Sequence, residues 1–437
     1  MLSLAVACGP GQGREPAPMP REARSSAEIL PPHHYRLELE DETASVTLWL
    51  PHSEEPIEVD LPQLPGRSER RTQIEDLRCD GAALPASSAW RLPMGCRVLT
   101  WRVRFQAPPP EGVDPAARRA VRDPERRWWF LPGAAVFIRP EGSTSPGTVD
   151  IRAPEALPVF HRLPPSDRLG YELPPPPASG RVLLGFGGFV ERETGDGATT
   201  YRHLFDREPS VEPTTVTAQH AQGAAYLARV TGARPPAAID IYWFGQSAAR
   251  RTVSGAAGVD AVAAGFLVGE LSADAPAHAR HAALLVLLHE QFHLLAGGRL
   301  PAWASESLAH YYALEALVHG QAMTEVELEA FVNDAAAAQG EGTLLEAQRV
   351  YAAGGAGAAD AYARFYTRGA AFWRELDVAL RAASEGQRTL DDLLRDILGL
   401  VFVEGGAPPA RFLELVRAAG VEQPEAITHR HLGWPAG

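Results

Sequence analysis

The most informative segment of the sequence is Leu284-Leu-Val-Leu-Leu-His289-Glu290-Gln-Phe-His293-Leu-Leu295. Its apolar residues predict a buried helix, which Gly297-Gly298 would end. On a helix His289 and His293 are four positions apart and share one face, so both imidazoles can bind the same ion. Two histidines and a glutamate are costly in an apolar core unless something satisfies them. The stretch therefore favours a metal centre over a packed helix with two unrelated histidines.

The residue types favour zinc and hydrolysis. Neutral imidazoles are good ligands for Zn²⁺. Glu290 directly follows the first histidine, where its carboxylate reaches a water molecule rather than the metal and can act as a general base. Zinc lowers the pKa of such a water toward neutrality, so hydroxide becomes available to attack a carbonyl group.

A third ligand is expected shortly after the histidine pair. Pro301-Ala-Trp-Ala-Ser-Glu306-Ser-Leu-Ala-His310-Tyr-Tyr312 places Glu306 at the start of a new helix. Two consecutive antiparallel helices would bring Glu306 against the histidines, and two histidines, one glutamate and an open position form a catalytic zinc arrangement. His310, one turn later, is a rival ligand. Because it lies deeper in the helix, we expect it to have a structural or supporting role.

The His289–His293 motif, followed by the Pro301–Tyr312 segment with Glu306, resembles the gluzincin metallopeptidases. This thermolysin-like group includes the aminopeptidase N and glycyl aminopeptidase families. Phe365-Tyr366-Thr-Arg-Gly369 is also similar to the Y-x-[KR]-G segment of these enzymes. In that group the tyrosine donates a hydrogen bond to the tetrahedral oxyanion, and Tyr366 matches it. The resemblance thus implies Glu290 and Tyr366 as catalytic residues. It implies that zinc is held by His289, His293 and Glu306.

One upstream region departs from this group. The aminopeptidases carry an edge-strand Gly-x-x-Glu motif whose glutamate binds the free amine of the substrate. The matching region, residues 253–268, begins Val253-Ser-Gly-Ala-Ala-Gly-Val-Asp260 and contains no Glu. Asp260 is one candidate for this role. The sequence therefore leaves aminopeptidase and endopeptidase activity open.

Short alternating runs predict a β-sandwich in the first half of the chain. Residues 35–40, 45–50 and 97–105 alternate apolar and polar side chains, and 135–138 have the composition of a further strand. Turns rich in Pro and Gly separate these runs. Regularly spaced short strands of this kind are typical of a sandwich. We place this domain at residues 33–205.

The second part of the chain is mainly helical. A helix over 216–230 and a strand over 238–244 precede it, in the order that the gluzincins have. Further helices are predicted over 277–296, 304–319, 324–338, 343–353, 358–383, 389–399 and 409–419. The predicted fold class is therefore α+β and multidomain, with an N-terminal β-sandwich followed by a thermolysin-like, mainly helical zinc-peptidase domain at 206–437.

The cysteines bear on cellular location. Met1-Leu-Ser-Leu-Ala-Val-Ala-Cys8 resembles the end of a bacterial lipoprotein signal, with Cys8 as a lipid anchor. Residues 1–32 then form a signal remnant and a flexible tether. In an exported protein Cys79 and Cys96 could form a disulfide, and two buried free thiols fit the sequence equally well. We expect a lipid-anchored or periplasmic protein of the bacterial cell envelope, and the sequence leaves a cytoplasmic location open.

These observations predict a zinc-dependent metallopeptidase that acts on peptide or protein substrates. The formal net charge of −13 argues against a nucleic-acid partner, which would need a basic face. The alternative is a catalytically inactive gluzincin-fold envelope protein that acts as a binding or structural module. The missing amine-binding glutamate suggests it, whereas the intact Glu290 argues against it because a structural zinc site needs no base. A zinc hydrolase of a non-peptide amide or ester is a third hypothesis.

Overall fold

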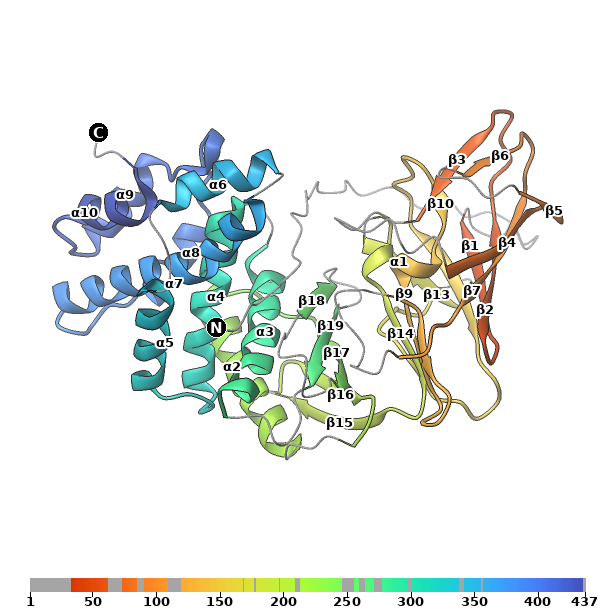
Figure 1. The fold of residues 1–437 in the computed structure, drawn as a ribbon, viewed down its shortest axis with the longest axis horizontal. Coiled ribbons are helices and arrows are strands. Elements are labelled where there is room, and N and C mark those ends of the chain that lie inside the picture. Colours follow the sequence, from red (N-terminus) through yellow and green to blue (C-terminus); the bar gives the residue numbers. More distant parts are fainter. Residues whose placement is uncertain are drawn as a thin grey trace.

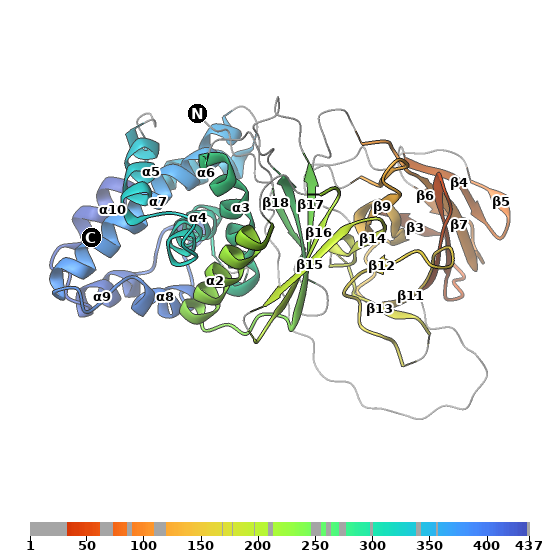
Figure 2. The same ribbon diagram turned by 90° about the horizontal axis from the view of Figure 1, so that it is seen from below.

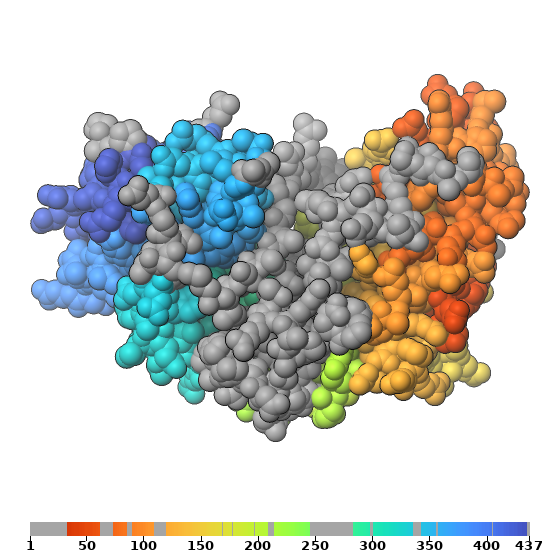
Figure 3. Space-filling model, viewed as in Figure 1, coloured from red at the N-terminus to blue at the C-terminus, as the bar shows by residue number. Residues whose placement is uncertain are grey.

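In the computed structural model the strands and the helices gather at opposite ends of the molecule, with one mixed sheet between them (Figures 1 and 2). Figure 3 shows the same two ends in space-filling form. The predicted tether, Cys8 and Asp260 lie outside the described residues. The structure describes residues 33–61, 73–84, 90–108, 119–167, 169–176, 178–195, 197–208, 213–245, 255–258, 264–270, 277–297, 300–337, 342–354 and 357–434.

The largest sheet of the N-terminal half has seven strands in the order β13-β11-β1-β2-β7-β4-β5. In β2 the buried side chains Ala44, Val46 and Leu48 alternate with partly exposed ones, as expected for a sheet with one face in the core. Strands β1 and β11 are parallel, and the other pairs are antiparallel. The strands are β1 His34–Leu39, β2 Thr43–Trp49, β4 Ile74–Cys79, β5 Ala82–Ala83, β7 Val98–Arg104, β11 Gly147–Arg152 and β13 Tyr171–Leu173.

Two smaller sheets and a short helix complete this half. The predicted strand over 135–138 is wrong, because α1 covers Gly133–Val136. A short, fully buried apolar run has no periodicity that separates a strand from a helix. The three-stranded sheet contains β10 Arg139–Pro140, β3 Ile57–Asp60 and β6 Trp90–Leu92. The four-stranded sheet contains β12 Val159–Phe160, β14 Leu183–Gly187, β9 Trp128–Pro132 and β8 Val121–Asp123, and the 3-10 helix η3 is Ala178–Arg181.

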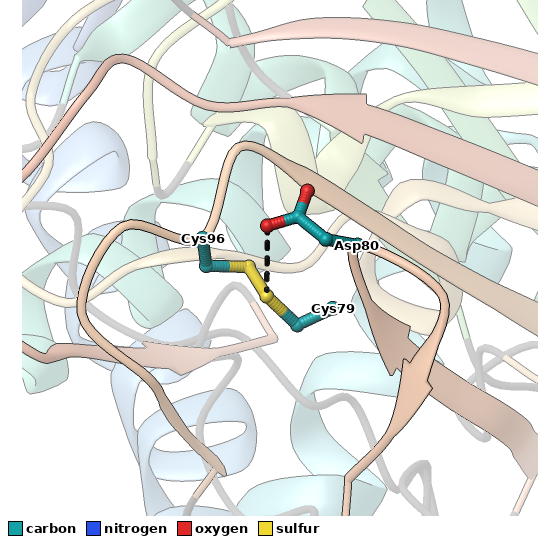
Figure 4. A group of neighbouring side chains, drawn as sticks. All are labelled: Cys79, Asp80 and Cys96. Atoms are coloured by element: carbon teal, nitrogen blue, oxygen red, sulfur yellow. Dashed lines mark hydrogen bonds between the residues drawn. A yellow bond between two sulfur atoms is a disulfide. The ribbon is translucent and has the colours of Figure 1, made fainter.

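A disulfide joins Cys79, at the end of β4, to Cys96, in the turn before β7 (Figure 4). Both cysteines are buried. Oδ2 of Asp80 lies 3.6 Å from Sγ of Cys79, and Oδ1 of Asp80 accepts a hydrogen bond from the backbone N–H of Val98 at 3.0 Å. Of the two states that the sequence leaves open, the structure has the disulfide. Because the sulfurs are bonded to each other, this cluster offers no thiolate to a metal.

A five-stranded sheet in the order β15-β16-β17-β19-β18 lies between the two ends (Figure 2). Strands β16, β17 and β19 are parallel, and the two outer strands are antiparallel to their neighbours. The boundary predicted between residues 205 and 206 falls between two strands of this sheet. The strands are β15 Val190–Gly195, β16 Thr200–Phe205, β17 Ala238–Gly245, β18 Gly255–Gly258 and β19 Ala264–Glu270.

Helices form the C-terminal end and enclose the largest apolar core of the described residues. The sequence did not predict α10, which starts at Pro424, a residue favoured in a first helical turn. Among the described residues no helix has the length and apolar character needed to cross a bilayer. The helices are α2 Pro213–Thr231, α3 Ala277–Ala296, α4 Ala302–His319, α5 Glu325–Ala337, α6 Leu344–Ala353, α7 Ala358–Ala383, α8 Asp391–Leu398, η4 Glu404–Gly406, α9 Ala410–Ala418 and α10 Pro424–Leu432.

Candidate metal centre

Helix α3 carries the two predicted histidine ligands on one face. Nε2 of His293 lies 3.0 Å from Nε2 of His289, and the ring centroids are 4.7 Å apart. His289 is buried, whereas the His293 side chain is 15% exposed. Solvent therefore reaches the pair at His293.

Glu306, in the first turns of α4, points at both histidines. Its Oε2 lies 3.2 Å from Nε2 of His289 and 3.6 Å from Nε2 of His293. The start of α4 is fixed by Trp303, whose indole N–H donates to the carbonyl of Gly406 at 2.7 Å. The backbone N–H of Trp303 also donates to Oε1 of Gln348 at 3.0 Å. Contacts with α6 and η4 therefore hold Glu306 in place.

The three donor atoms fit a tetrahedral zinc ion. Ligand atoms about 2.0–2.1 Å from a tetrahedral Zn²⁺ lie about 3.3–3.4 Å from one another. The separations of 3.0, 3.2 and 3.6 Å between the two Nε2 atoms and Oε2 bracket that value. Of the described residues, this is the group of His and carboxylate side chains that converges closely enough to hold a metal ion. Three protein ligands would leave a fourth position open, as in catalytic zinc sites.

Charge in the cluster is distributed in favour of a cation. Burial raises the pKa of Glu306, but the two histidines outweigh burial and hold that pKa well below its usual range. Burial lowers the pKa of His293, and the carboxylates of Glu306 and Glu290 more than offset this, so the pKa is raised. A buried, ionised carboxylate beside two imidazoles is a donor set that a divalent metal neutralises.

Tyr366, on α7, joins the cluster through Glu306. Its hydroxyl donates to Oε2 of Glu306 at 2.7 Å, and the Tyr366 side chain is buried. The two helices touch next to this bond, because a methyl group added at Gly369 would lie 2.2 Å from Cβ of Ser307. The indole N–H of Trp373 donates to Oγ of Ser307 at 2.7 Å. The close crossing of α4 and α7 therefore places the phenol.

Two further side chains border the ligands. Oγ of Ser305 lies 3.3 Å from Nδ1 of His293, so it can orient that ring. The His310 ring centroid lies 6.2 Å from that of His289 and 5.4 Å from that of Tyr366, outside the ligand cluster. Burial, followed by the charge of His289, lowers the pKa of His310 to about 3. The structure thus places His310 behind the site rather than at it.

Glu290 and Gln291, inside the motif, are both fully enclosed. Glu290 is 1% exposed and is near enough to contribute to the raised pKa of His293. The sequence does not single out Gln291, although an amide within a mainly apolar helical run is a signal that could have found it. Ser305 was also missed, because one serine in a first helical turn has many ordinary uses.

Comparison with solved structures finds the same fold in zinc peptidases. The chain is similar to an aminopeptidase N family protein from Idiomarina loihiensis, with a TM-score of 0.68, 16% identity, and coverage of 92% of this chain and 76% of that one. It is also similar to an M1 zinc metallopeptidase from Deinococcus radiodurans, solved as a glutamate-to-alanine variant bound to a Tyr-Ser-Ala substrate, with a TM-score of 0.51, 16% identity, and coverage of 93% and 94%. No family model matches the sequence, and no curated protein matches it. The comparison confirms the predicted gluzincin aminopeptidase-like fold.

Proposed function

We propose that this protein is a zinc-dependent peptidase. The observation that carries the proposal is the convergence of His289, His293 and Glu306 on one point, in a fold shared with zinc peptidases. These three residues would hold the ion. When bound, zinc would polarise the substrate carbonyl and lower the pKa of a water molecule.

The remaining buried groups would move the protons. Glu290 would accept a proton from water as the oxygen bonds to the carbonyl carbon, and would return it to the nitrogen when the carbon–nitrogen bond breaks. Tyr366 would donate its hydroxyl proton in a hydrogen bond to the developing oxyanion. In the structure that hydroxyl donates to Glu306. For this role the Tyr366 hydroxyl must leave Glu306 and donate to the oxyanion instead.

Peptides are the proposed substrates. Support comes from the Deinococcus radiodurans structure, which is bound to a Tyr-Ser-Ala substrate. A matched pair of peptides, one with a free amino terminus and one N-acetylated, separates the two modes of cleavage. Cleavage of the free peptide alone would indicate an aminopeptidase, and cleavage of both an endopeptidase.

One variant tests the proposal directly. Purified protein is expected to hold about one zinc per chain, as a three-ligand catalytic site requires. Glu290→Gln should keep the zinc and lose cleavage of a broad peptide library, since the amide cannot accept the proton. Glu414→Gln, an exposed pair partner of Arg411, is the matched control and should behave as wild type.

Two results would contradict this proposal. If wild type binds zinc and cleaves no peptide, the binding-module alternative replaces it. If Glu290→Gln cleaves as fast as wild type, the assigned base is wrong.

We also propose that the protein works in the bacterial cell envelope. The disulfide between Cys79 and Cys96 supports this, because such bonds persist in oxidising compartments. Protein from fractionated cells can be denatured and alkylated with and without prior reduction, and its mass measured by mass spectrometry. Two cysteines should react only after reduction, and the protein should be found in the envelope fraction. Full alkylation without reduction, or recovery from the cytoplasmic fraction, would contradict the proposal.

A further inference from the structure

Gln291 is fully buried and is hydrogen-bonded at both ends of its side-chain amide. Its Oε1 accepts a hydrogen bond from Nε2–H of His220, on α2, at 2.8 Å. Its amide nitrogen donates to the hydroxyl of Tyr201, on β16, at 3.0 Å. One side chain therefore links the metal-binding helix α3 to a neighbouring helix and to the five-stranded sheet.

Helical spacing puts Gln291 on the back of α3. At about 100° per residue, Gln291 is about 200° around the helix from both His289 and His293, and about 100° from Glu290. The histidines face Glu306 on α4, whereas Gln291 faces the sheet and α2. A rotation of α3 about its axis would move both sides of the helix together. Hydrogen bonds that hold Gln291 therefore also control the position of His289 and His293 on the opposite side.

The apolar part of this interface restrains the rotation of α3 less sharply than hydrogen bonds do. Val286 and Leu287 of α3 pack against a cluster that includes Ile239 and Ile241 of β17. Hydrophobic contact depends on buried area and has no preferred direction. Hydrogen bonds weaken steeply when their angles change. The two hydrogen bonds of Gln291 therefore add directional restraints to the apolar contacts.

The partners of Gln291 are themselves held in place. The His220 ring makes edge contacts with Tyr201 at 4.8 Å and with His203 at 5.4 Å between centroids. Nδ1 of His203 accepts a hydrogen bond from the indole N–H of Trp243 at 3.1 Å. Burial, followed by the charge of His220, lowers the pKa of His203 well below its usual range, so the ring is neutral and can accept. The anchor for α3 is thus a packed polar cluster on the sheet.

We propose that Gln291 is a positioning residue, which fixes the rotation of α3 so that Glu290 and the two histidines reach their working positions. This inference rests on the proposed function. With side-chain ends about 5–6 Å from the helix axis, a rotation of about 10° moves them by about 1 Å. A misplacement of about 1 Å can cost roughly a hundredfold in rate.

Gln291→Met tests this role, since it removes both hydrogen bonds while keeping the length of the side chain. We expect kcat to fall by about 10- to 100-fold with KM within about twofold of wild type. The Zn²⁺ dissociation constant, measured by competition with a chelator, should rise by about tenfold.

Val286→Ala is the matched control. It opens a cavity in the same interface of α3 and leaves the hydrogen bonds of Gln291 intact. It should lower the melting temperature, with kcat, KM and zinc affinity within about twofold of wild type, because large-to-small changes act mainly on stability. Tyr201→Phe removes one of the two bonds and should give effects between those of wild type and Gln291→Met.

The outcomes separate positioning from packing. If Gln291→Met lowers the melting temperature as Val286→Ala does, yet keeps kcat and zinc affinity within about twofold of wild type, the proposal is overturned. If wild type binds zinc and cleaves no peptide, the proposed function fails on its own. In that case the zinc dissociation constants of Gln291→Met and Val286→Ala still decide the role of Gln291.

Discussion

Helices α4 and α7 contain two buried clusters of charged side chains. In each cluster a glutamate of α4 accepts a hydrogen bond from a tyrosine, but the other partners of the two glutamates differ. At one cluster Glu306 accepts a hydrogen bond from Tyr366 at 2.7 Å, and at the other Glu315 accepts one from Tyr311 at 2.9 Å. The two glutamates are nine positions apart on α4, about 13 Å along the helix. The remaining partners differ. Glu306 faces two histidines, whereas Glu315 faces Arg374 at 3.3 Å.

We call the cluster around Glu315 the closed cluster, because Arg374 already supplies its cation, and the cluster around Glu306 the open cluster. Arg374 contacts the carboxylates of Glu315, Glu325, Glu329 and Asp377. A guanidinium is always charged and carries five donors, so it satisfies several carboxylates at once and leaves no need for an ion. At Glu306 the neighbouring imidazoles are groups that can themselves bind a metal ion. A cluster that lacks a permanent cation can bind one, and this difference separates the candidate metal site from the structural network around Arg374.

The largest effect is expected from Glu306→Gln, which breaks the open cluster. The change removes the anionic ligand and leaves an amide, a poor donor for zinc. We expect zinc affinity to fall by more than the roughly 10- to 100-fold that is typical of outer-shell residues. Chelator competition measures this. Glu414→Gln is the surface control, and unchanged zinc affinity in Glu306→Gln would mean that the ion is held elsewhere.

Arg374→Met breaks the closed cluster and should act on stability. It removes the cation that Glu315 and Asp377 share in the core, and breaking a buried pair costs about 3–5 kcal/mol. Denaturant unfolding should show this loss, while the folded variant still binds zinc with wild-type affinity. Arg411→Met, in an exposed pair with Glu414, should change stability by about 1 kcal/mol at most. A loss of zinc affinity in Arg374→Met would show that the two clusters are not independent.

Gly369→Ala should separate the two helices beside the open cluster. The added methyl group would meet Cβ of Ser307, so α7 must shift and carry Tyr366 away from Glu306. Overpacking of this kind costs about 1–3 kcal/mol, and kcat should fall by about tenfold or more.

Ser307→Gly combined with Gly369→Ala is the matched test of that steric cause. It removes the obstructing Cβ, so kcat should recover relative to Gly369→Ala alone. Because Ser307→Gly also removes the acceptor of the Trp373 indole N–H, Ser307→Gly alone is the reference for that loss. A double variant that is slower than Ser307→Gly alone, and as slow as Gly369→Ala, would assign the loss to something other than this contact.

Local spacing explains which parts of the site the sequence could predict. His289 and His293 follow from helical periodicity, Glu290 follows from its place directly after the first histidine, and Glu306 follows from a short segment one turn into the next helix. The disulfide could not be decided, because pairing of Cys79 with Cys96 depends on the register of β4 against β7.

The contacts that hold the ligands were not predictable in the same way. The Gly369–Ser307 approach joins segments 62 residues apart in the chain. Gln291 reaches partners on α2 and β16, and its role depends on which face of α3 meets the sheet. An apolar helix such as α3 has hydrophobic residues on all sides, so the sequence does not say which face that is. Tertiary packing decides these positions.

The smallest effect is expected on the pH dependence of stability, through the raised pKa of Glu315 in the closed cluster. Burial raises the pKa of Glu315 to about 7, with Asp377 and Glu325 adding to the rise and Tyr311 and Arg374 opposing it. The folded state then binds a proton more tightly than the unfolded one, so this group's contribution to stability falls as pH rises from about 4.5 to about 7, and levels off above that. Glu315→Gln cannot titrate and should lack this fall. The difference in melting temperature between the variant and wild type should therefore change by about 2 °C or more across pH 5 to 8. A constant difference over that range would mean that Arg374 keeps Glu315 ionised, and that both glutamates of α4 are charged in the fold.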